Sequence, residues 1–152
     1  MYAIAGMERA AVRRGLVYRT TAAGPLTLDV YAPPDAAAGA RLPAVVLVEG
    51  YNDAGFEKVF GSRFKDTDMV VSWAQLIAAS GLVAITYTNR EPAADLDALL
   101  QHLRENAAAL GIDGDRIEQA TAEFRPGDEA ANRGRPAGVV LLEQIGLAGD
   151  ER

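Results

Sequence analysis

Four adjacent residues are the main candidates for chemistry in this sequence: Glu49, Gly50, Tyr51 and Asn52. Glu49 follows the apolar run Val45 to Val48, and the carboxyl end of a buried strand is where open α/β sheets bind ligands. The backbone N–H groups of Tyr51 and Asn52 could act as oxyanion donors, which stabilise the charge that develops during acyl transfer. Two alternatives stay open: Glu49 faces solvent as a polar residue, and the others form an ordinary loop or the remnant of an incomplete site.

Other residues capable of chemistry are isolated. His102 is the single histidine, and it is either a general base or a solvated residue on a helix flank. The chain has no cysteine, and a lone histidine does not make a zinc site. Asp113-Gly114-Asp115 is either a cation loop or a plain turn, and it lacks the further oxygens of a calcium site. We also find no glycine-rich phosphate motif, so we expect no metal and no cofactor.

The composition indicates one globular domain without nucleic acid or membrane partners. The chain has 152 residues, 49% of them hydrophobic, and a formal net charge of −6. An acidic chain with dispersed basic residues argues against nucleic acid or an anionic membrane as partner. We find no apolar run of membrane-spanning length and no signal peptide, so we expect a soluble, cytoplasmic protein.

The elements that position Glu49 follow from the apolar pattern. Val45 to Val48 lies between Pro43 and Gly50, which predicts a strand buried on both faces. Residues 16–20 and 26–31 predict an antiparallel hairpin at the edge of a sheet, joined at Ala23-Gly24-Pro25.

Helices and a second buried strand follow. Tyr51 to Asp68 reads as an irregular segment. Ser72 and Gln75 fit a capping box for a helix, and Gly81 suits the position just past its end. Leu82 to Tyr87 predicts a strand. Pro92 suits the first position of a further helix, whose apolar stripe is formed by Leu96, Leu99, Leu100, Leu103, Ala107 and Leu110. This order predicts an α/β layered domain with an N-terminal hairpin, parallel strands and covering helices.

The order of these segments resembles the amino-terminal portion of the α/β-hydrolase family, over about Leu16 to Ile117. Val48-Glu49-Gly50-Tyr51 is similar to the end of the third strand and the oxyanion loop of these enzymes. Residues 110–117, Leu-Gly-Ile-Asp-Gly-Asp-Arg-Ile, are similar to the lead into their nucleophile strand. The likeness is nearest to the dienelactone-hydrolase and small-esterase branch, where a Glu also occurs at the position of Glu49. The resemblance implies hydrolysis of a small-molecule ester or lactone through an acyl-enzyme.

The sequence departs from that family after Ile117. None of Ser62, Ser72 and Ser80 has glycines two residues before and two after, as the nucleophile turn Gly-x-Ser-x-Gly requires. No histidine follows Ile117 either, so the base of a catalytic triad is missing as well as the nucleophile. We therefore expect little or no turnover. A truncated or frameshifted product and a genuine short protein both stay open, and sequencing the DNA across codon 117 separates them.

The departure divides the chain into a partial hydrolase-like domain, residues 1–117, and a divergent tail, residues 118–152. We expect the tail to be loop or disorder with a possible short strand at residues 139–142. Without a nucleophile strand, Val45 to Val48 would form an uncovered apolar edge. We therefore expect residues 139–142 to dock there, or the protein to self-associate. A non-catalytic binding or assembly module is the alternative function, and a flavodoxin-like ligand binder is a third reading.

Overall fold

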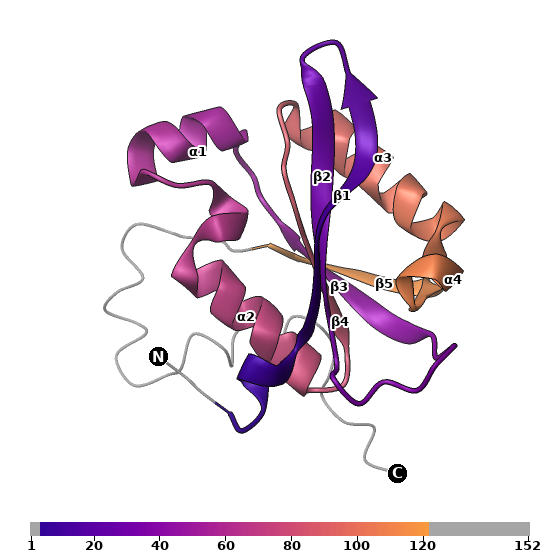
Figure 1. The fold of residues 1–152 in the computed structure, drawn as a ribbon. Helices are drawn as coiled ribbons and strands as arrows, with labels where there is room; N and C mark the ends of the chain where they lie inside the picture. Colours follow the sequence, from indigo (N-terminus) through magenta and orange to yellow (C-terminus); the bar gives the residue numbers. More distant parts are fainter. Residues whose placement is uncertain (1–3, 122–152) are drawn as a thin grey trace.

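The computed structural model describes residues 4–121, which form one mixed sheet with helices on both faces (Figure 1). The strands lie in the order β1-β2-β4-β3-β5. Their bounds are β1 Ala11–Thr21, β2 Gly24–Ala32, β3 Leu42–Val48, β4 Val83–Tyr87 and β5 Ile112–Thr121. The helices are α1 Asp53–Phe60, α2 Asp68–Ala79, α3 Pro92–Glu105 and α4 Ala107–Leu110, with short 3-10 helices at Met7–Arg9 and Phe64–Asp66. The predicted α/β class is confirmed.

The pairing of the strands agrees with the predicted hairpin and crossover. β1 and β2 form an antiparallel hairpin, and β2 also runs antiparallel to β4. β3 runs parallel to both β4 and β5. The hairpin supplies the outer strand on one side of the sheet, as its alternating pattern predicts.

β3 is buried on both faces because its side chains alternate between two cores. Ala44 and Val46 pack in the core that α3 and α4 cover. Val45 and Leu47 pack in the core that α2 covers. Each fully buried valine or leucine stabilises the fold by about 1.5–3 kcal/mol, so this strand fixes the sheet on which the Glu49 loop is built.

Two predictions about helices need correction. The segment from Tyr51 to Asp68 contains α1, whose start is capped by Asn52: its Oδ1 accepts a hydrogen bond from the N–H of Gly55 at 2.7 Å. α2 begins at Asp68 rather than near Ser72, because Thr67 caps it by accepting from the N–H of Val70. Either Thr67 or Ser72 is a chemically suitable cap, so the sequence pattern did not distinguish them.

The ends of the helices follow the sequence more closely. Gly81 lies just after α2 with a φ of 90°, and Gly111 follows α4 with a φ of 70°. Glycine adopts this left-handed conformation without the strain that a Cβ atom causes. Pro92 is the first residue of α3, as predicted. The predicted apolar stripe packs against the sheet, although the helix breaks at Asn106 between α3 and α4.

The expectation that β3 forms an uncovered edge is wrong. β5 pairs with β3 along residues 44–48, from Ala44 opposite Ile117 to Val48 opposite Thr121. Residues 118–121 are therefore strand and not loop. The sequence does not indicate this strand, because only Ile112 and Ala120 of β5 are buried and the segment has no alternation of apolar and polar residues. The predicted short strand at residues 139–142 lies outside the described residues.

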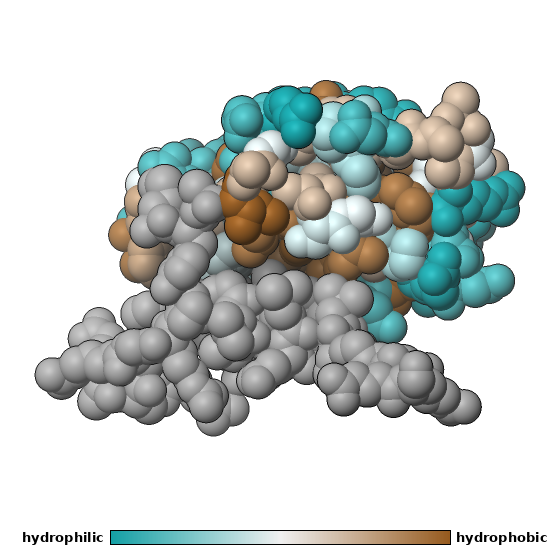
Figure 2. Space-filling view, turned by 90° about the horizontal axis from the view of Figure 1, so that it is seen from below, coloured by the Kyte–Doolittle hydropathy of each residue, from teal (hydrophilic) through white to brown (hydrophobic). Residues whose placement is uncertain are grey.

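Exposed apolar side chains are spread over several elements. Val17 on β1, Val59 and Phe60 on α1, and Met69 on α2 each expose about half of their surface or more. Single exposed residues on different elements are normal for folded proteins. Seen from below, apolar residues lie mostly in the middle of the described surface, and the most hydrophilic residues lie mostly around them (Figure 2). Within residues 4–121, every helix is too short or too polar to cross a bilayer.

Candidate functional site

The carboxyl ends of β3 and β4 bring together the residues with unusual chemistry. Glu49 follows β3 directly, and Thr88 and Asn89 follow β4. Glu49 is only 2% exposed, so the alternative in which it faces solvent is wrong. Its backbone N–H donates a hydrogen bond to the hydroxyl oxygen of Tyr87 at 3.3 Å, which holds the end of β3 against the end of β4.

The loop from Gly50 to Asn52 bridges β3 and α1 at the surface. Tyr51 is 74% exposed, and Gly50 and Asn52 are exposed too. The N–H groups of Tyr51 and Asn52 donate no hydrogen bond within residues 4–121. Unpaired N–H groups at the end of a central strand have the chemistry of anion donors, which keeps both residues as oxyanion candidates.

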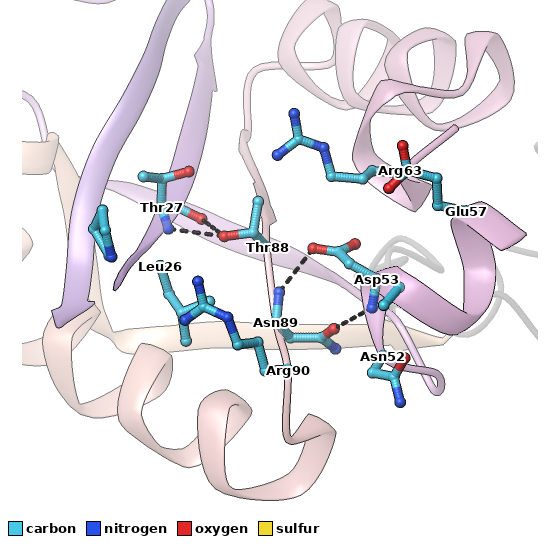
Figure 3. Close-up of a pocket in the computed structure, with 11 residues that line it drawn as sticks. Leu26, Thr27, Asn52, Asp53, Glu57, Arg63, Thr88, Asn89 and Arg90 are labelled. Carbon is cyan, nitrogen blue, oxygen red and sulfur yellow. Dashed lines mark hydrogen bonds between the residues drawn. The ribbon is translucent and has the colours of Figure 1, made fainter. Parts of the chain in front are cut away.

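Asn89 holds this loop, and the sequence analysis missed it. Its Oδ1 accepts from the N–H of Asp53 at 2.9 Å, and its own N–H donates to Oδ2 of Asp53 at 3.0 Å (Figure 3). Its Nδ2 also donates to the carbonyl oxygen of Tyr51 at 3.1 Å. Asn89 is 2% exposed. A polar residue two positions after a buried strand was the available signal, since strand ends are where such sheets bind ligands.

Glu49 and Asp53 form a buried carboxyl pair. Burial is the largest effect and, with the charge of Asp53 and the hydrogen bond that a protonated Glu49 can donate to Asp53, raises the pKa of Glu49 to about 9. Burial also raises the pKa of Asp53, although the hydrogen bond from Asn89 opposes this. Burial and the nearby charges raise the pKa of Tyr87 to about 12, against a weaker lowering effect of its hydrogen bond with Glu49. Burial, helped by the neighbouring acidic groups, therefore favours the protonated forms of Glu49 and Tyr87.

A cleft of about 590 Å³ opens beside this pair, between the start of β2, the start of α1 and the segment after β4. Among the predicted candidates Asn52 lines it, whereas Glu49, Gly50 and Tyr51 do not. Its charged and polar lining consists of Thr27, Asp53, Glu57, Arg63, Thr88, Asn89 and Arg90 together with Asn52. The cleft thus presents cationic and anionic groups on opposing elements, which suits a small polar ligand.

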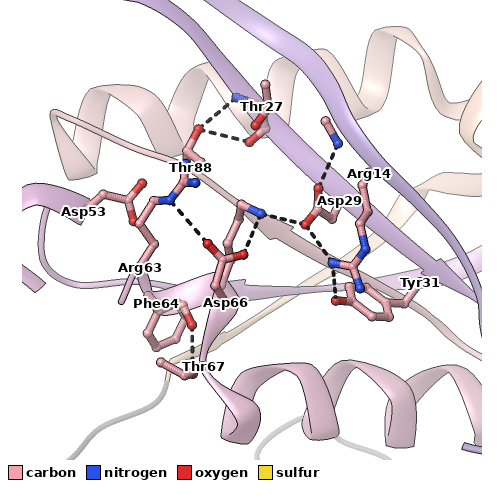
Figure 4. Close-up of polar contacts among 12 residues, drawn as sticks. Arg14, Thr27, Asp29, Tyr31, Asp53, Arg63, Phe64, Asp66, Thr67 and Thr88 are labelled. Atoms are coloured by element: carbon pink, nitrogen blue, oxygen red, sulfur yellow. Dashed lines mark hydrogen bonds and ion pairs between the residues drawn. The ribbon is translucent and has the colours of Figure 1, made fainter. Parts of the chain in front are cut away.

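A second polar cluster anchors the segment between α1 and α2 (Figure 4). Lys65 Nζ lies 2.9 Å from Oδ2 of Asp29 and 3.0 Å from Oδ1 of Asp66. Arg14 Nη1 lies 3.6 Å from the same Asp29 oxygen and donates to the hydroxyl of Tyr31 at 3.3 Å. Burial opposes the charge of Lys65 most, but its hydrogen bonds and ion pairs with the two aspartates together raise its pKa.

The remaining candidates are not brought together. His102 lies on α3, where its Nδ1 is 3.4 Å from Nδ2 of Asn106. Ser72 lies in α2 and Ser80 directly after it, on the face of the sheet opposite to α3. Ser80 Oγ donates to the carbonyl oxygen of Leu76. Asp113 is the second residue of β5, and its Oδ1 accepts from the N–H of Asp115 at 3.0 Å. Within residues 4–121 no three His, Cys, Asp or Glu side chains gather as a metal site.

Comparison with known proteins identifies the fold. No protein-family model and no curated protein sequence matches the chain. Solved structures do match. An esterase from the planctomycete Thermogutta terrifontis superposes with a TM-score of 0.53 at 23% identity, covering 76% of this chain and 40% of the esterase chain. Its propionate-bound form gives the same TM-score and identity, with 76% and 42% covered. The butyrate-bound form gives a TM-score of 0.52 at 23% identity, with 76% and 41% covered.

The chain therefore spans less than half the length of these esterases. At such low identity the likeness concerns the fold. The described residues have a partial α/β-hydrolase-like fold of the kind found in esterases.

Proposed function

We propose that this chain carries the amino-terminal part of a hydrolase that cleaves carboxylic esters or lactones, in the dienelactone-hydrolase and small-esterase branch. The observation that carries the proposal is the sheet order together with the Glu49 loop. β5 ends at Thr121 opposite Val48, one residue before Glu49. The end of β5 thus lies at the same end of the sheet as the loop with Tyr51 and Asn52, whose N–H groups donate no hydrogen bond within residues 4–121. This is where an acyl group would be attacked.

The proposed substrate is an ester with a short acyl chain. The esterase structures that match this fold hold propionate and butyrate in two cases. The cleft beside Asp53 has a volume of about 590 Å³ and polar side chains on each of its walls, which suits a small ester or lactone better than a long-chain lipid. Glu49 at the end of β3 supports the branch, since the same residue type occurs there in the dienelactone-hydrolase resemblance.

The proposal includes low activity for this chain alone. The 152 residues contain no Gly-x-Ser-x-Gly and no histidine after His102. Oxyanion donors and binding without a nucleophile leave only modest residual catalysis, about 10³–10⁴-fold over water in enzymes from which the triad was removed. In the same proposal, residues 1–117 are the hydrolase-like part and residues 118–152 are the divergent part. β5 extends four residues past this boundary, to Thr121.

The test uses the purified chain with p-nitrophenyl propionate and butyrate and with a serine-reactive phosphonate probe. We expect no covalent labelling and, at most, slow hydrolysis that does not saturate. Labelling of Ser62, Ser72 or Ser80, located by mass spectrometry, would contradict the proposal of low activity. Saturable binding of propionate or butyrate near the Glu49 loop, followed by NMR shifts of the Tyr51 and Asn52 amides, would support the ester-hydrolase origin of the site.

A second candidate is a non-catalytic assembly module, and the position of β5 favours it. Within residues 4–121 β5 is the outermost strand beside β3, so its far edge carries unpaired backbone groups. Such an edge is a template for pairing with a second copy of the chain. Sedimentation at increasing concentration tests this: assembly predicts a dimer or larger species that a proline in place of Glu118 dissociates.

A further inference from the structure

Two carboxyl groups meet in the interior where β3 passes into α1. Glu49 is 2% exposed and Asp53 is 8% exposed. Both oxygens of Glu49 and Oδ1 of Asp53 accept no hydrogen bond from an N–H or O–H group within residues 4–121. A buried carboxylate without a partner is strongly unfavourable, and it takes up a proton instead. Two charged carboxylates at this place would therefore be inconsistent with a stable loop.

The surroundings supply little compensating positive charge. Arg63 is the cation that acts on Asp53, but its side chain is 49% exposed and its Nε is 3.3 Å from an oxygen of Asp66. The titratable or charged groups that act on the pair or on its neighbours are Tyr18 and Arg19 on β1, Tyr87 on β4, Asp95 on α3, and Arg63 and Asp66 around the 3-10 helix. Arg19 is paired with Asp95, at 2.7 Å from its Oδ1. Most of these groups are acidic or neutral, so the environment does not favour two negative charges.

We propose that Glu49 and Asp53 share one proton at neutral pH, and that this proton locks the β3–α1 loop onto the start of α1. Glu49 is the acid and Asp53 is the carboxylate. Asp53 is the first residue of α1, where the helix dipole favours negative charge. Its Oδ2 also accepts the N–H of Asn89 at 3.0 Å, which stabilises the ionised form. The hydroxyl of protonated Glu49 then donates to Oδ1 of Asp53 and satisfies it.

The direction of the pH effect follows from the pKa of Glu49, which rises from an ordinary value of 4.5 to about 9 through burial and the neighbouring Asp53. Between these values the folded chain holds a proton that the unfolded chain has lost. Stability therefore decreases as pH rises through this window and levels off above about 9. Above it a second buried negative charge forms, and the loop that carries Tyr51 and Asn52 separates from α1.

This lock is a property of the loop itself, and it holds whether or not the chain hydrolyses an ester. It makes the position of the unpaired N–H groups of Tyr51 and Asn52 depend on pH. Any ligand that these groups bind would consequently bind more weakly in alkaline solution than near neutral pH.

Urea unfolding of the full chain from pH 5 to pH 10 tests the shared proton. The variants are Glu49→Gln, which mimics the protonated acid and does not titrate, and Glu105→Gln, a matched control at an exposed position of α3 away from the cleft. We expect the unfolding equilibrium constant of the wild type to increase relative to Glu49→Gln by up to about tenfold per pH unit within the window. The control variant should follow the wild type at every pH.

Parallel pH profiles for the wild type and Glu49→Gln would overturn the proposal, because an ionised or ion-paired Glu49 gives no such divergence. Infrared spectroscopy of the wild type with ¹³C-labelled glutamate provides a second measurement that needs no variant to fold. We expect the carbonyl stretch of one protonated glutamic acid at pH 7 and its loss above about pH 9. A spectrum at pH 7 with carboxylate bands alone would equally overturn the shared proton.

Discussion

Two buried acidic residues on neighbouring parts of the sheet are stabilised in opposite ways. Asp29 on β2 has a side chain that is 1% exposed, and it forms an ion pair with Lys65, whose side chain is 11% exposed. Glu49 after β3 is as deeply buried, but its neighbour is the carboxyl group of Asp53. Among the described residues, one buried acid reaches a cation, and the other has a second acid as its neighbour.

The comparison shows that burial alone does not decide how a carboxyl group behaves. Asp29 also accepts the N–H of Gly15 at 2.9 Å and lies 3.6 Å from Arg14, so its negative charge is well compensated. The Glu49–Asp53 pair has no comparable cation within the described residues and relies on a proton. The stability contributed by the Asp29–Lys65 cluster should therefore depend on its cationic partner, whereas that of the Glu49–Asp53 pair should depend on pH.

The largest effect is expected from Lys65→Met. It leaves Asp29 buried without its closest cation, and breaking a buried ion pair in this way costs about 3–5 kcal/mol. We expect a loss of about 3 kcal/mol, at the low end of that range, because Arg14 and the N–H of Gly15 remain. Urea unfolding measures it. Lys58→Met, on the exposed face of α1, is the control and should change stability by less than about 0.5 kcal/mol.

The pH dependence of Lys65→Met separates the two clusters. The pKa of Lys65 is raised above its ordinary value of 10.5, so its stabilisation is present below that value and is lost as pH rises through the raised pKa. The difference between the wild type and Lys65→Met should stay constant from pH 5 to pH 9. If the difference in unfolding free energy decreased steadily over this range, the Asp29–Lys65 cluster would depend on pH as the Glu49–Asp53 pair does, and the contrast between them would be wrong.

Asn89→Ala is expected to have the next largest effect. The change leaves the N–H of Asp53 and the carbonyl of Tyr51 without their partner, and an unsatisfied buried group costs about 1–3 kcal/mol. We expect a loss of about 2 kcal/mol, together with faster amide exchange at Asp53. Gln101→Ala, whose side chain bonds only to the exposed Glu105, is the matched control. Unchanged exchange at Asp53 would show that Asn89 does not hold the loop.

The smallest effect concerns the helix that follows Lys65. Thr67→Ala removes the cap of α2 and should cost about 1 kcal/mol. Ser72→Ala, inside the same helix, should change stability by less than about 0.5 kcal/mol. Unfolding by urea and amide exchange at Val70 compare the two variants. A larger loss in Ser72→Ala would restore the capping box predicted from the sequence and place the start of α2 five residues later.

Much of the fold follows from the sequence because its signals are local. The apolar run Val45 to Val48 between Pro43 and Gly50 predicts a strand buried on both faces, and alternation at residues 26–31 predicts the second strand of the hairpin. Pro92 and Gly111 mark a helical start and end. These patterns depend on periodicity and backbone geometry, which neighbouring residues determine.

Three features were decided by tertiary structure. β5 is recognised only through its pairing with β3, since just two of its ten residues are buried and they do not give the alternation of a strand. Asn89 acts through hydrogen bonds to Asp53 and Tyr51, which lie more than thirty residues away in sequence.

The third feature is the state of Glu49. The sequence places a carboxyl group after a buried strand, and this position was predicted. Its burial, its neighbour and the resulting rise in its pKa depend on how α1 folds back against the end of β4. Local sequence determines where an ionisable group stands along the chain, whereas the solvent and charges around it are set by segments that meet only in the folded protein.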